Sequence, residues 1–171
     1  MKRSGRTLKQ RLYGLKHLPS HIRRARYFRG HGVHSPYIYD IVRQVFMRST
    51  LMGDDHTLYD ALRLQGVAHK RSVQLQTLVI HCNYKAWSID QIGEDVDFAI
   101  ITLNIGSDAL AEYARRAAER GITICITDPY YSAPRWEVCR ELIETHASTS
   151  VDNRGYLLLF NNHLPKQRFR L

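Results

Sequence analysis

The chain has 171 residues, of which 44% are hydrophobic and 24% are charged, and this composition is typical of one globular domain. A domain of this length buries enough surface to fold without a disulfide framework or a structural metal. No apolar run of signal-peptide length follows the N-terminus, and no apolar stretch of roughly 18 residues occurs anywhere. The sequence therefore predicts a cytoplasmic protein without a membrane span.

Positive charge is concentrated at the N-terminus. The formal net charge is +9, and residues 1–39 contain ten Lys or Arg and no Asp or Glu. We expect residues 1–30 to form a basic arm and residues 31–171 to form a single domain. Such an arm attracts nucleic acid, anionic lipid or an acidic protein, so weak binding of nucleic acid without sequence preference is one interpretation. Association with a membrane surface is a second, and an arm that is solvated or packs on its own domain is the third.

The first half of the chain reads as helices. Leucines at helical spacing predict a basic amphipathic helix over 7–17. Ser35 and Pro36 have the residue types of an N-cap and a first helical position, and they predict a helix over 36–48. A further helix is expected over 57–65, and residues 66–74 are interpreted as a linker.

From residue 77 onwards the pattern alternates between strands and helices. Apolar runs predict strands at 77–82, 97–103, 122–127 and 156–160, with a short strand near 149–152. Helices are expected over 107–120, capped by Ser107 and ended by Gly121, and from Pro134 onwards. Near-continuous apolar strands favour an α/β fold with a mostly parallel sheet that helices cover. The last two strands are joined by three residues, so they predict an antiparallel hairpin at its edge.

Two segments carry a resemblance to a known family. Residues 26–40, which read RYFRGHGVHSPYIYD, resemble the opening signature of a group of class I S-adenosylmethionine-dependent methyltransferases that is frequent in the Bacteroidetes. Residues 96–171 are similar to the second half of the same family, with an Asp-Phe-led strand, a Trp-containing helix and a closing hairpin. The resemblance implies a Rossmann-like methyltransferase sheet, S-adenosylmethionine as cofactor and methyl transfer as activity.

The chain departs from that family where the cofactor would bind. The family places a glycine-rich loop of the E-x-G-x-x-x-G type after its first strand and an acid after its second. Neither follows the expected strand 77–82, and residues 83–95 suffice for one crossover only. Strand 77–82 is therefore expected beside strand 97–103, in a sheet reduced to about five strands. We expect its exposed edge to be covered by helices of residues 36–65 or by a second subunit, which makes a homodimer an alternative to an unidentified protein partner.

The residues that the resemblance leaves as candidates for cofactor binding follow the expected strands; they are Asn83, Asn104, Asp128, Tyr130 and Tyr131. Ligands bind at the carboxyl ends of the strands in open α/β sheets. Lys85 and Trp87 are expected to face the same crevice. No metal site is predicted, because metal-dependent relatives would place more acids beside Asn104 and Asp128. His31 and His34 are interpreted as part of a capped turn rather than as a metal-binding pair.

Three functions are compatible with these residues. The first is a methyltransferase-like protein that is catalytically degenerate and acts as a binding or accessory protein. The second is an active S-adenosylmethionine-dependent methyltransferase with an altered cofactor site that uses Asn83, Asn104 and Asp128. The third is a nucleic-acid-binding protein that uses its basic arm. No catalytic residue is assigned.

Overall fold

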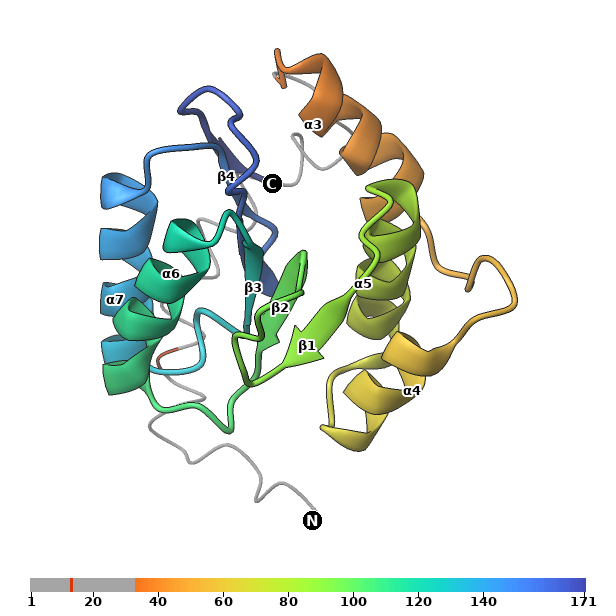
Figure 1. Cartoon of the computed structure of the whole chain (residues 1–171), viewed down its shortest axis with the longest axis horizontal. Coiled ribbons are helices and arrows are strands. Elements are labelled where there is room, and N and C mark those ends of the chain that lie inside the picture. Colours follow the sequence, from red (N-terminus) through yellow and green to blue (C-terminus); the bar gives the residue numbers. More distant parts are fainter. Residues whose placement is uncertain (1–12, 14–32) are drawn as a thin grey trace.

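The computed structural model describes residue 13 and residues 33–171 of the chain. Helices cover both faces of one sheet, so the domain has three layers, with the N-terminal helices on one face and two later helices on the other (Figure 1). The described part of the chain thus has the α/β architecture that its sequence predicts. Most of the basic arm, including the helix expected over 7–17 and His31, lies outside the described residues.

The sheet has six strands in the order β1-β2-β3-β5-β4-β6. Strands β1 (Trp87–Ile89), β2 (Phe98–Ile101) and β3 (Thr123–Thr127) are parallel neighbours. Strand β5 (Tyr156–Leu159) is antiparallel to both β3 and β4 (Ser150–Asp152), which confirms the hairpin. Its expected place at the edge of the sheet is wrong, because a further strand lies beyond β4. Strand β6 (Arg168–Arg170) was not expected, and it pairs with β4 in parallel and forms the last strand of the sheet.

The predicted start of the first described helix is confirmed. Helix α3 (Pro36–Ile41) begins after Ser35, whose hydroxyl accepts a hydrogen bond from the amide of Ile38 at 3.4 Å. The helix continues through a wider turn, η1 (Val42–Phe46), so the expected helix 36–48 is present within one or two residues. Helix α4 (Thr57–Leu64) agrees with the helix expected over 57–65.

The strand expected at 77–82 is wrong, because these residues belong to helix α5 (His69–His81). The β-branched residues of this run favour a strand locally, but Leu75, Leu78 and Val79 recur at helical spacing and are buried in the core. All residues from Ser72 to Val79 are buried, which removes the amphipathic signal. The expected linker 66–74 is accordingly wrong from His69 onwards. The place beside β2 is taken instead by β1, which is only three residues long.

The helices on the other face are close to those predicted. Helix α6 (Leu110–Glu119) is preceded by a short 3-10 turn, η2 (Ser107–Ala109), so Ser107 begins that turn and does not cap α6. Gly121 ends the helix with a positive φ of 70°, a conformation that glycine adopts at low cost. Helix α7 (Ala133–Thr145) is capped by Ser132 and carries Pro134 in its first turn.

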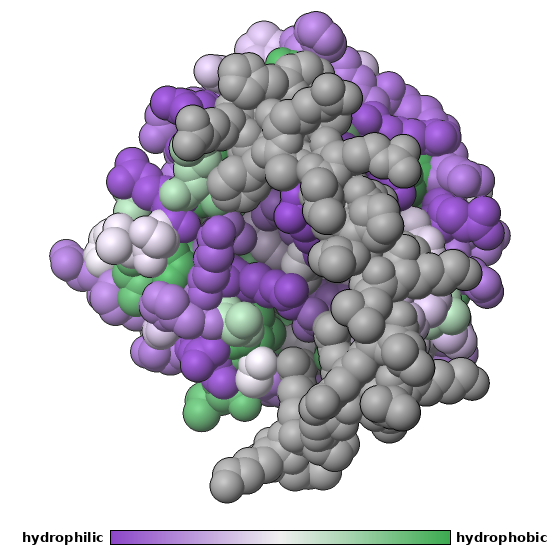
Figure 2. Space-filling model, turned by 180° about the vertical axis from the view of Figure 1, so that it is seen from behind, coloured by the Kyte–Doolittle hydropathy of each residue, from purple (hydrophilic) through white to green (hydrophobic). Residues whose placement is uncertain are grey.

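Two hydrophobic cores lie on the two sides of the sheet. One joins the sheet to α3, η1, α4 and α5, and the other joins it to α6 and α7. Seen from the side opposite to Figure 1, the described surface is mainly hydrophilic, with separated hydrophobic patches (Figure 2). Among the described residues, no helix has the length and apolar character needed to cross a membrane.

Candidate functional site

The parallel strands bring most of the predicted site residues to one edge of the sheet. Asn104 follows β2, and Asp128, Tyr130 and Tyr131 follow β3, so these residues lie at the carboxyl ends of neighbouring parallel strands. Asn83 does not join them. Asn83 and Lys85 both precede β1, so they lie at the opposite edge of the sheet, where the parallel strands begin. There the Asn83 amide oxygen accepts a hydrogen bond from Lys85 at 2.7 Å.

At the end of β1, Asp90 joins the first two parallel strands. Its carboxylate accepts hydrogen bonds from the amide and the hydroxyl of Thr102, both at 2.6 Å. It also accepts one from the side-chain amide of Asn104 at 3.0 Å, and Asn104 donates to Gln65 at 2.8 Å. Asp90 has a positive φ of 58°, which Asp tolerates better than most residues do. The amide donors of the candidate Asn104 are thus already used by the protein.

Between β2 and β3, the edge is closed by the buried side chain of Arg135 from α7, which is 2% exposed. Its Nε and Nη2 donate to the carbonyl of Thr127 at 3.2 and 3.0 Å. Its Nη2 also donates to the carbonyl of Thr102 at 3.2 Å, and its Nη1 donates to that of Ile105 at 3.1 Å. One guanidinium therefore satisfies carbonyls from the ends of two adjacent strands, where a ligand would otherwise find them.

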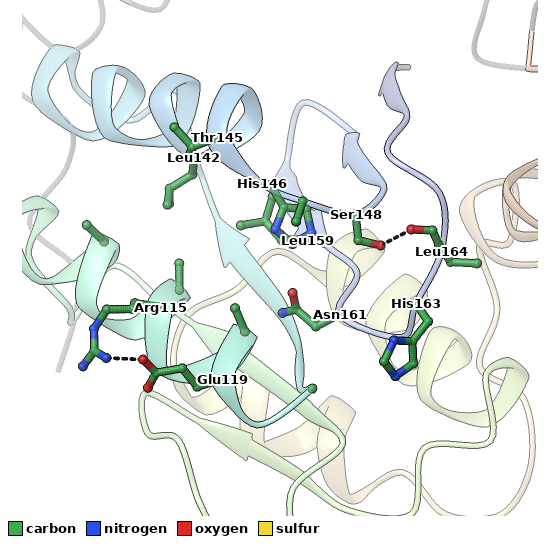
Figure 3. Close-up of a pocket in the computed structure, with 15 residues that line it drawn as sticks. Arg115, Glu119, Leu142, Thr145, His146, Ser148, Leu159, Asn161, His163 and Leu164 are labelled. Atoms are coloured by element: carbon green, nitrogen blue, oxygen red, sulfur yellow. Dashed lines mark hydrogen bonds and ion pairs between the residues drawn. The ribbon is translucent and has the colours of Figure 1, made fainter.

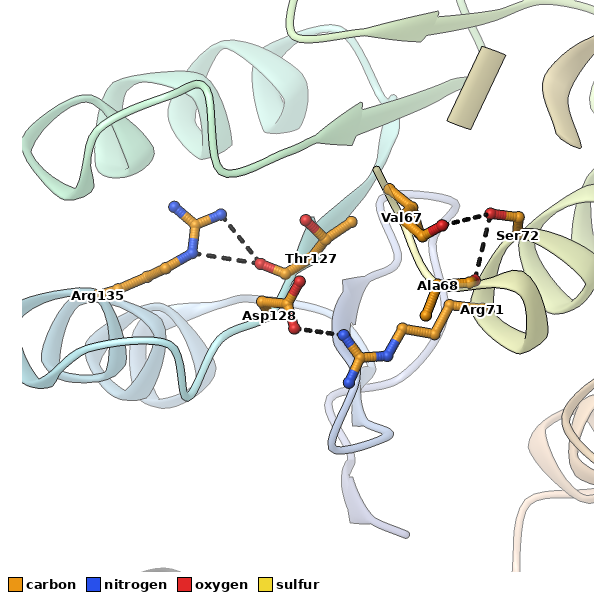
Figure 4. A network of polar contacts seen from close by, with 7 residues as sticks. All are labelled: Val67, Ala68, Arg71, Ser72, Thr127, Asp128 and Arg135. Carbon is orange, nitrogen blue, oxygen red and sulfur yellow. Dashed lines mark hydrogen bonds and ion pairs between the residues drawn. The ribbon is translucent and has the colours of Figure 1, made fainter. Parts of the chain in front are cut away.

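A second arginine reaches the same edge from the opposite helical layer (Figure 4). Arg71 of α5 forms an ion pair with Asp128, whose backbone amide donates to the carbonyl of Gly155 at 2.8 Å. Asp128 also has a positive φ of 48°. The candidate acid is therefore directed at a protein cation. In the same view, the Thr127 hydroxyl is buried and makes no hydrogen bond within the part of the chain that the structure describes.

The two tyrosines after β3 differ in their surroundings. Tyr130 is 9% exposed, its ring stacks on Trp136 with centroids 4.3 Å apart, and its hydroxyl donates to Asp152. Tyr131 is half-buried, and its backbone amide donates to the carbonyl of Asp128 at 3.0 Å. Tyr130 thus packs into the structure in the way that aromatic residues at the rim of a core do.

A large cavity lies elsewhere. A groove of about 770 Å³ runs between the C-terminal ends of α6 and α7 and the segment after β5 (Figure 3). It is lined by small residues of α6, such as Ala114 and Ala118, and by the polar side chains of His146, Asn161 and His163. Gly121, which lies two residues before the start of β3, also lines it, so the groove lies toward the amino ends of the parallel strands. A cavity of about 170 Å³ adjoins Asp128 through Arg71 and Gly155.

The described residues were also compared with what a metal site or a reactive thiol requires. These residues contain no cluster of three or more His, Cys, Asp or Glu that could hold a metal ion. His34 of the expected turn is exposed. The three cysteines are free, as expected, and Cys125 and Cys139 are buried. Burial raises the pKa of the Cys139 thiol to about 12 and that of Cys125 further, so neither thiol readily forms the reactive thiolate.

Sequence reasoning missed the three residues that determine the state of the carboxyl edge, which are Arg71, Asp90 and Arg135. A signal existed for Asp90, because an acid directly follows the Trp-Ser-Ile run, but three residues are too short a run to stand out as a strand. Arg135 lies among the charged residues of an ordinary surface helix, and only the packing of α7 on the sheet shows that it points inward.

Comparison with known proteins adds no assignment: no family model matches the chain, and no match was found among curated proteins or solved structures.

Proposed function

We propose that the chain is a methyltransferase-like protein that no longer transfers methyl groups and acts as a binding or accessory protein. The observation that carries this proposal is the state of the carboxyl edge. Asp90 and Arg135 tie β1, β2 and β3 together with hydrogen bonds to protein groups, and Arg71 engages Asp128. A cofactor at this edge would have to displace these contacts.

The order of the strands supports the resemblance on which the proposal rests. A doubly wound sheet has the order 3-2-1-4-5-6, and its ligand binds where the order reverses, beside strand 1. The parallel strands β1-β2-β3 correspond to strands 1, 4 and 5 of that order, so strands 2 and 3 have no counterpart among the described residues. The proposed ancestor would have held its ribose-binding acid after strand 2, which has no counterpart among the described residues.

The loop after β1 supports the same proposal. Asp90, Gln91, Ile92 and Gly93 follow this strand, so one glycine is present, three positions after the acid. The residues that follow β1 therefore do not have the E-x-G-x-x-x-G spacing of the family's glycine-rich loop. A Cβ atom at position 93 would meet the side chain of Val96, so this glycine allows Val96 to pack closely against the backbone.

The size of the neighbouring cavity agrees with this interpretation. Pockets for cofactor-sized ligands measure roughly 300 to 1,000 Å³. The cavity that adjoins Asp128 measures about 170 Å³, which suits a single small group and not a nucleoside. The alternative of an active methyltransferase with an altered site is weakened, because Asn83 lies at the other edge of the sheet from Asn104 and Asp128.

The proposal is tested by titrating the full chain with S-adenosylmethionine in a calorimeter, and with S-adenosylhomocysteine as a second ligand. We expect no saturable heat at millimolar ligand. A dissociation constant in the micromolar range would overturn the proposal and restore the enzyme. The variant Asp90→Asn provides the matched control, because a true cofactor site at this edge would lose affinity in it, whereas heat from nonspecific association would not change.

A further inference from the structure

The two outermost strands of the sheet differ in character. Strands β1 and β6 stand at the two ends of the strand order, and each pairs with a single strand among the described residues. In Figure 1, β1 is the first strand of the sheet beyond β2. An edge strand presents backbone N–H and C=O groups to which a further strand can add, and proteins commonly block such edges with charged side chains. The residues of each edge strand therefore decide whether it is open to pairing.

Strand β6 carries the charges that block an edge. Its first and last residues, Arg168 and Arg170, are both exposed. The carbonyl of Gln167 and the amide of Leu171 make hydrogen bonds to β4. Because the backbone groups of a strand point alternately to its two sides, those of Arg168 and Arg170 point to the free edge. A strand added there would therefore lie beside two arginines.

Strand β1 has no such protection, because its sequence Trp-Ser-Ile contains no charged residue. The amide of Asp90 donates to a carbonyl of β2 at 2.8 Å, and the carbonyl of Ala86 accepts from the amide at the start of β2 at 3.2 Å. By the same alternation, the backbone groups of Trp87 and Ile89 point away from β2. These groups make no hydrogen bond to any residue that the structure describes. The free edge of β1 is thus available to a further strand.

The residues of β1 are complementary to a second copy of the same strand. In an antiparallel pair centred on Ser88, Trp87 of one copy lies opposite Ile89 of the other, and the two residues exchange both of their N–H···O bonds. A twofold axis at Ser88 repeats this pair. Trp87 and Ile89 are only half-buried against the core beside α5. An aromatic residue opposite a β-branched residue stabilises a strand pair, so the side chains match as well.

Other ways of pairing two copies fit less well. In a parallel pair, a residue whose N–H and C=O face the partner strand lies opposite a residue whose groups face away. Two identical β1 edges therefore cannot pair in parallel with twofold symmetry. Pairing of β1 with β6 of another copy would not close and would build open chains, and Arg168 and Arg170 disfavour it. The closed antiparallel pair is the arrangement that these residues favour.

We propose that the free edge of β1 is the interface of a homodimer, in which two copies pair antiparallel and their two sheets become one. The inference stands on the geometry of β1 and does not depend on the proposed function. Because β1 is three residues long, the paired strands bury little surface. We therefore expect a weak dimer, with a dissociation constant in the micromolar range.

Sedimentation velocity of the full-length chain, from micromolar to millimolar protein, tests the proposal. The variant Ile89→Pro removes an N–H that faces the free edge and leaves the hydrogen bonds between β1 and β2 in place. Arg168→Pro is the control, because it removes an outward-facing N–H from the other edge of the sheet. Circular dichroism establishes that both variants keep the secondary structure of the natural chain.

We expect the natural chain and Arg168→Pro to dimerise alike, and Ile89→Pro to dimerise at least roughly tenfold more weakly. A natural chain that stays monomeric at millimolar concentration would overturn the proposal. Equal dimerisation of the two proline variants would overturn it as well, since the interface would then not involve the edge of β1.

Amide hydrogen exchange on the natural chain tests the same interface without a substitution that could disturb folding. We expect the amides of Trp87 and Ile89 to exchange more slowly in concentrated than in dilute solution, because the dimer protects them. The amides of Arg168 and Arg170 should exchange at rates that do not depend on concentration. Exchange of Trp87 and Ile89 that is equally independent of concentration would contradict the proposed interface.

Discussion

The carboxyl edge of the parallel strands and the groove between α6 and α7 differ in the open space that their side chains leave. At the carboxyl edge, Asp90 and Arg135 make hydrogen bonds to the backbone of the strands themselves, and Arg71 holds Asp128. The groove lies toward the C-terminal ends of α6 and α7, has a volume of about 770 Å³ and is lined by small residues and by polar side chains that include two histidines. At the edge where open α/β sheets bind their ligands, these three side chains thus contact the protein itself, whereas the groove is open space elsewhere in the described part of the chain.

Under the proposed function, a recognisable sheet does not imply a usable cofactor site. The strands need only be apolar and correctly spaced to form the sheet, but a cofactor also needs donors and acceptors that the protein leaves available. Here those groups stabilise the structure. We therefore expect changes at the carboxyl edge to affect stability strongly and changes in the groove to affect it little.

The largest effect is expected for Arg135→Ala. This change removes the guanidinium that donates to the carbonyls of Thr102, Ile105 and Thr127, and we expect the free energy of unfolding to fall by roughly 3 to 4 kcal/mol. Urea denaturation measures the change. Arg140→Ala, an exposed arginine on the same helix, is the control and should cost less than about 0.5 kcal/mol. Equal effects of the two changes would show that Arg135 has no special role.

A smaller loss is expected for Asp90→Asn. The amide keeps the shape of the side chain but offers one acceptor oxygen in place of two for the donors of Thr102 and Asn104. We expect a loss of about 1 to 2 kcal/mol in the same denaturation experiment. Asp95→Asn changes an exposed acid nearby and should be neutral. A neutral Asp90→Asn would mean that the carboxylate does not tie β1 to β2.

Much of the fold could be predicted from the sequence, because helix caps and apolar runs are local signals. Ser35 and Gly121 mark helix ends by their residue types, and the short Asn153–Gly155 connection requires a hairpin. Helix α5 could not be predicted in this way, since burial on all sides removes its periodicity. The site depended on that error: with 77–82 taken as a strand, Asn83 was placed at the wrong edge of the sheet.

The groove provides a pH-dependent prediction. His146 is half-buried, its Nε2 lies 2.8 Å from the carbonyl of Phe160, and burial lowers its pKa below the usual 6.5. A histidine whose pKa is lower in the folded state binds more protons when unfolded, so stability falls as the pH drops below about 6.5 through the folded pKa. We expect His146→Gln to reduce the loss of stability between pH 7 and pH 5. An unchanged pH profile in this variant would contradict the prediction.

The smallest effect is expected for Ala118→Leu, which adds a larger side chain to the open groove. Ala118 is exposed and lines this cavity, so the free energy of unfolding should change by less than about 0.5 kcal/mol. Ala117→Leu on the same helix enters the closed core instead, where Ala117 is 0% exposed, and overpacking should cost about 1 to 3 kcal/mol. Comparable costs for the two changes would show that the groove is closed in solution.

The closed state of the carboxyl edge is tested most directly by NMR titration of the ¹⁵N-labelled full chain with S-adenosylmethionine. The backbone amides of Thr102, Asn104 and Asp128 lie at this edge and report on any ligand that enters it. We expect these three signals to remain unshifted at millimolar ligand. Saturable, concerted shifts of the three amides at micromolar ligand would contradict the proposal that this edge binds no cofactor.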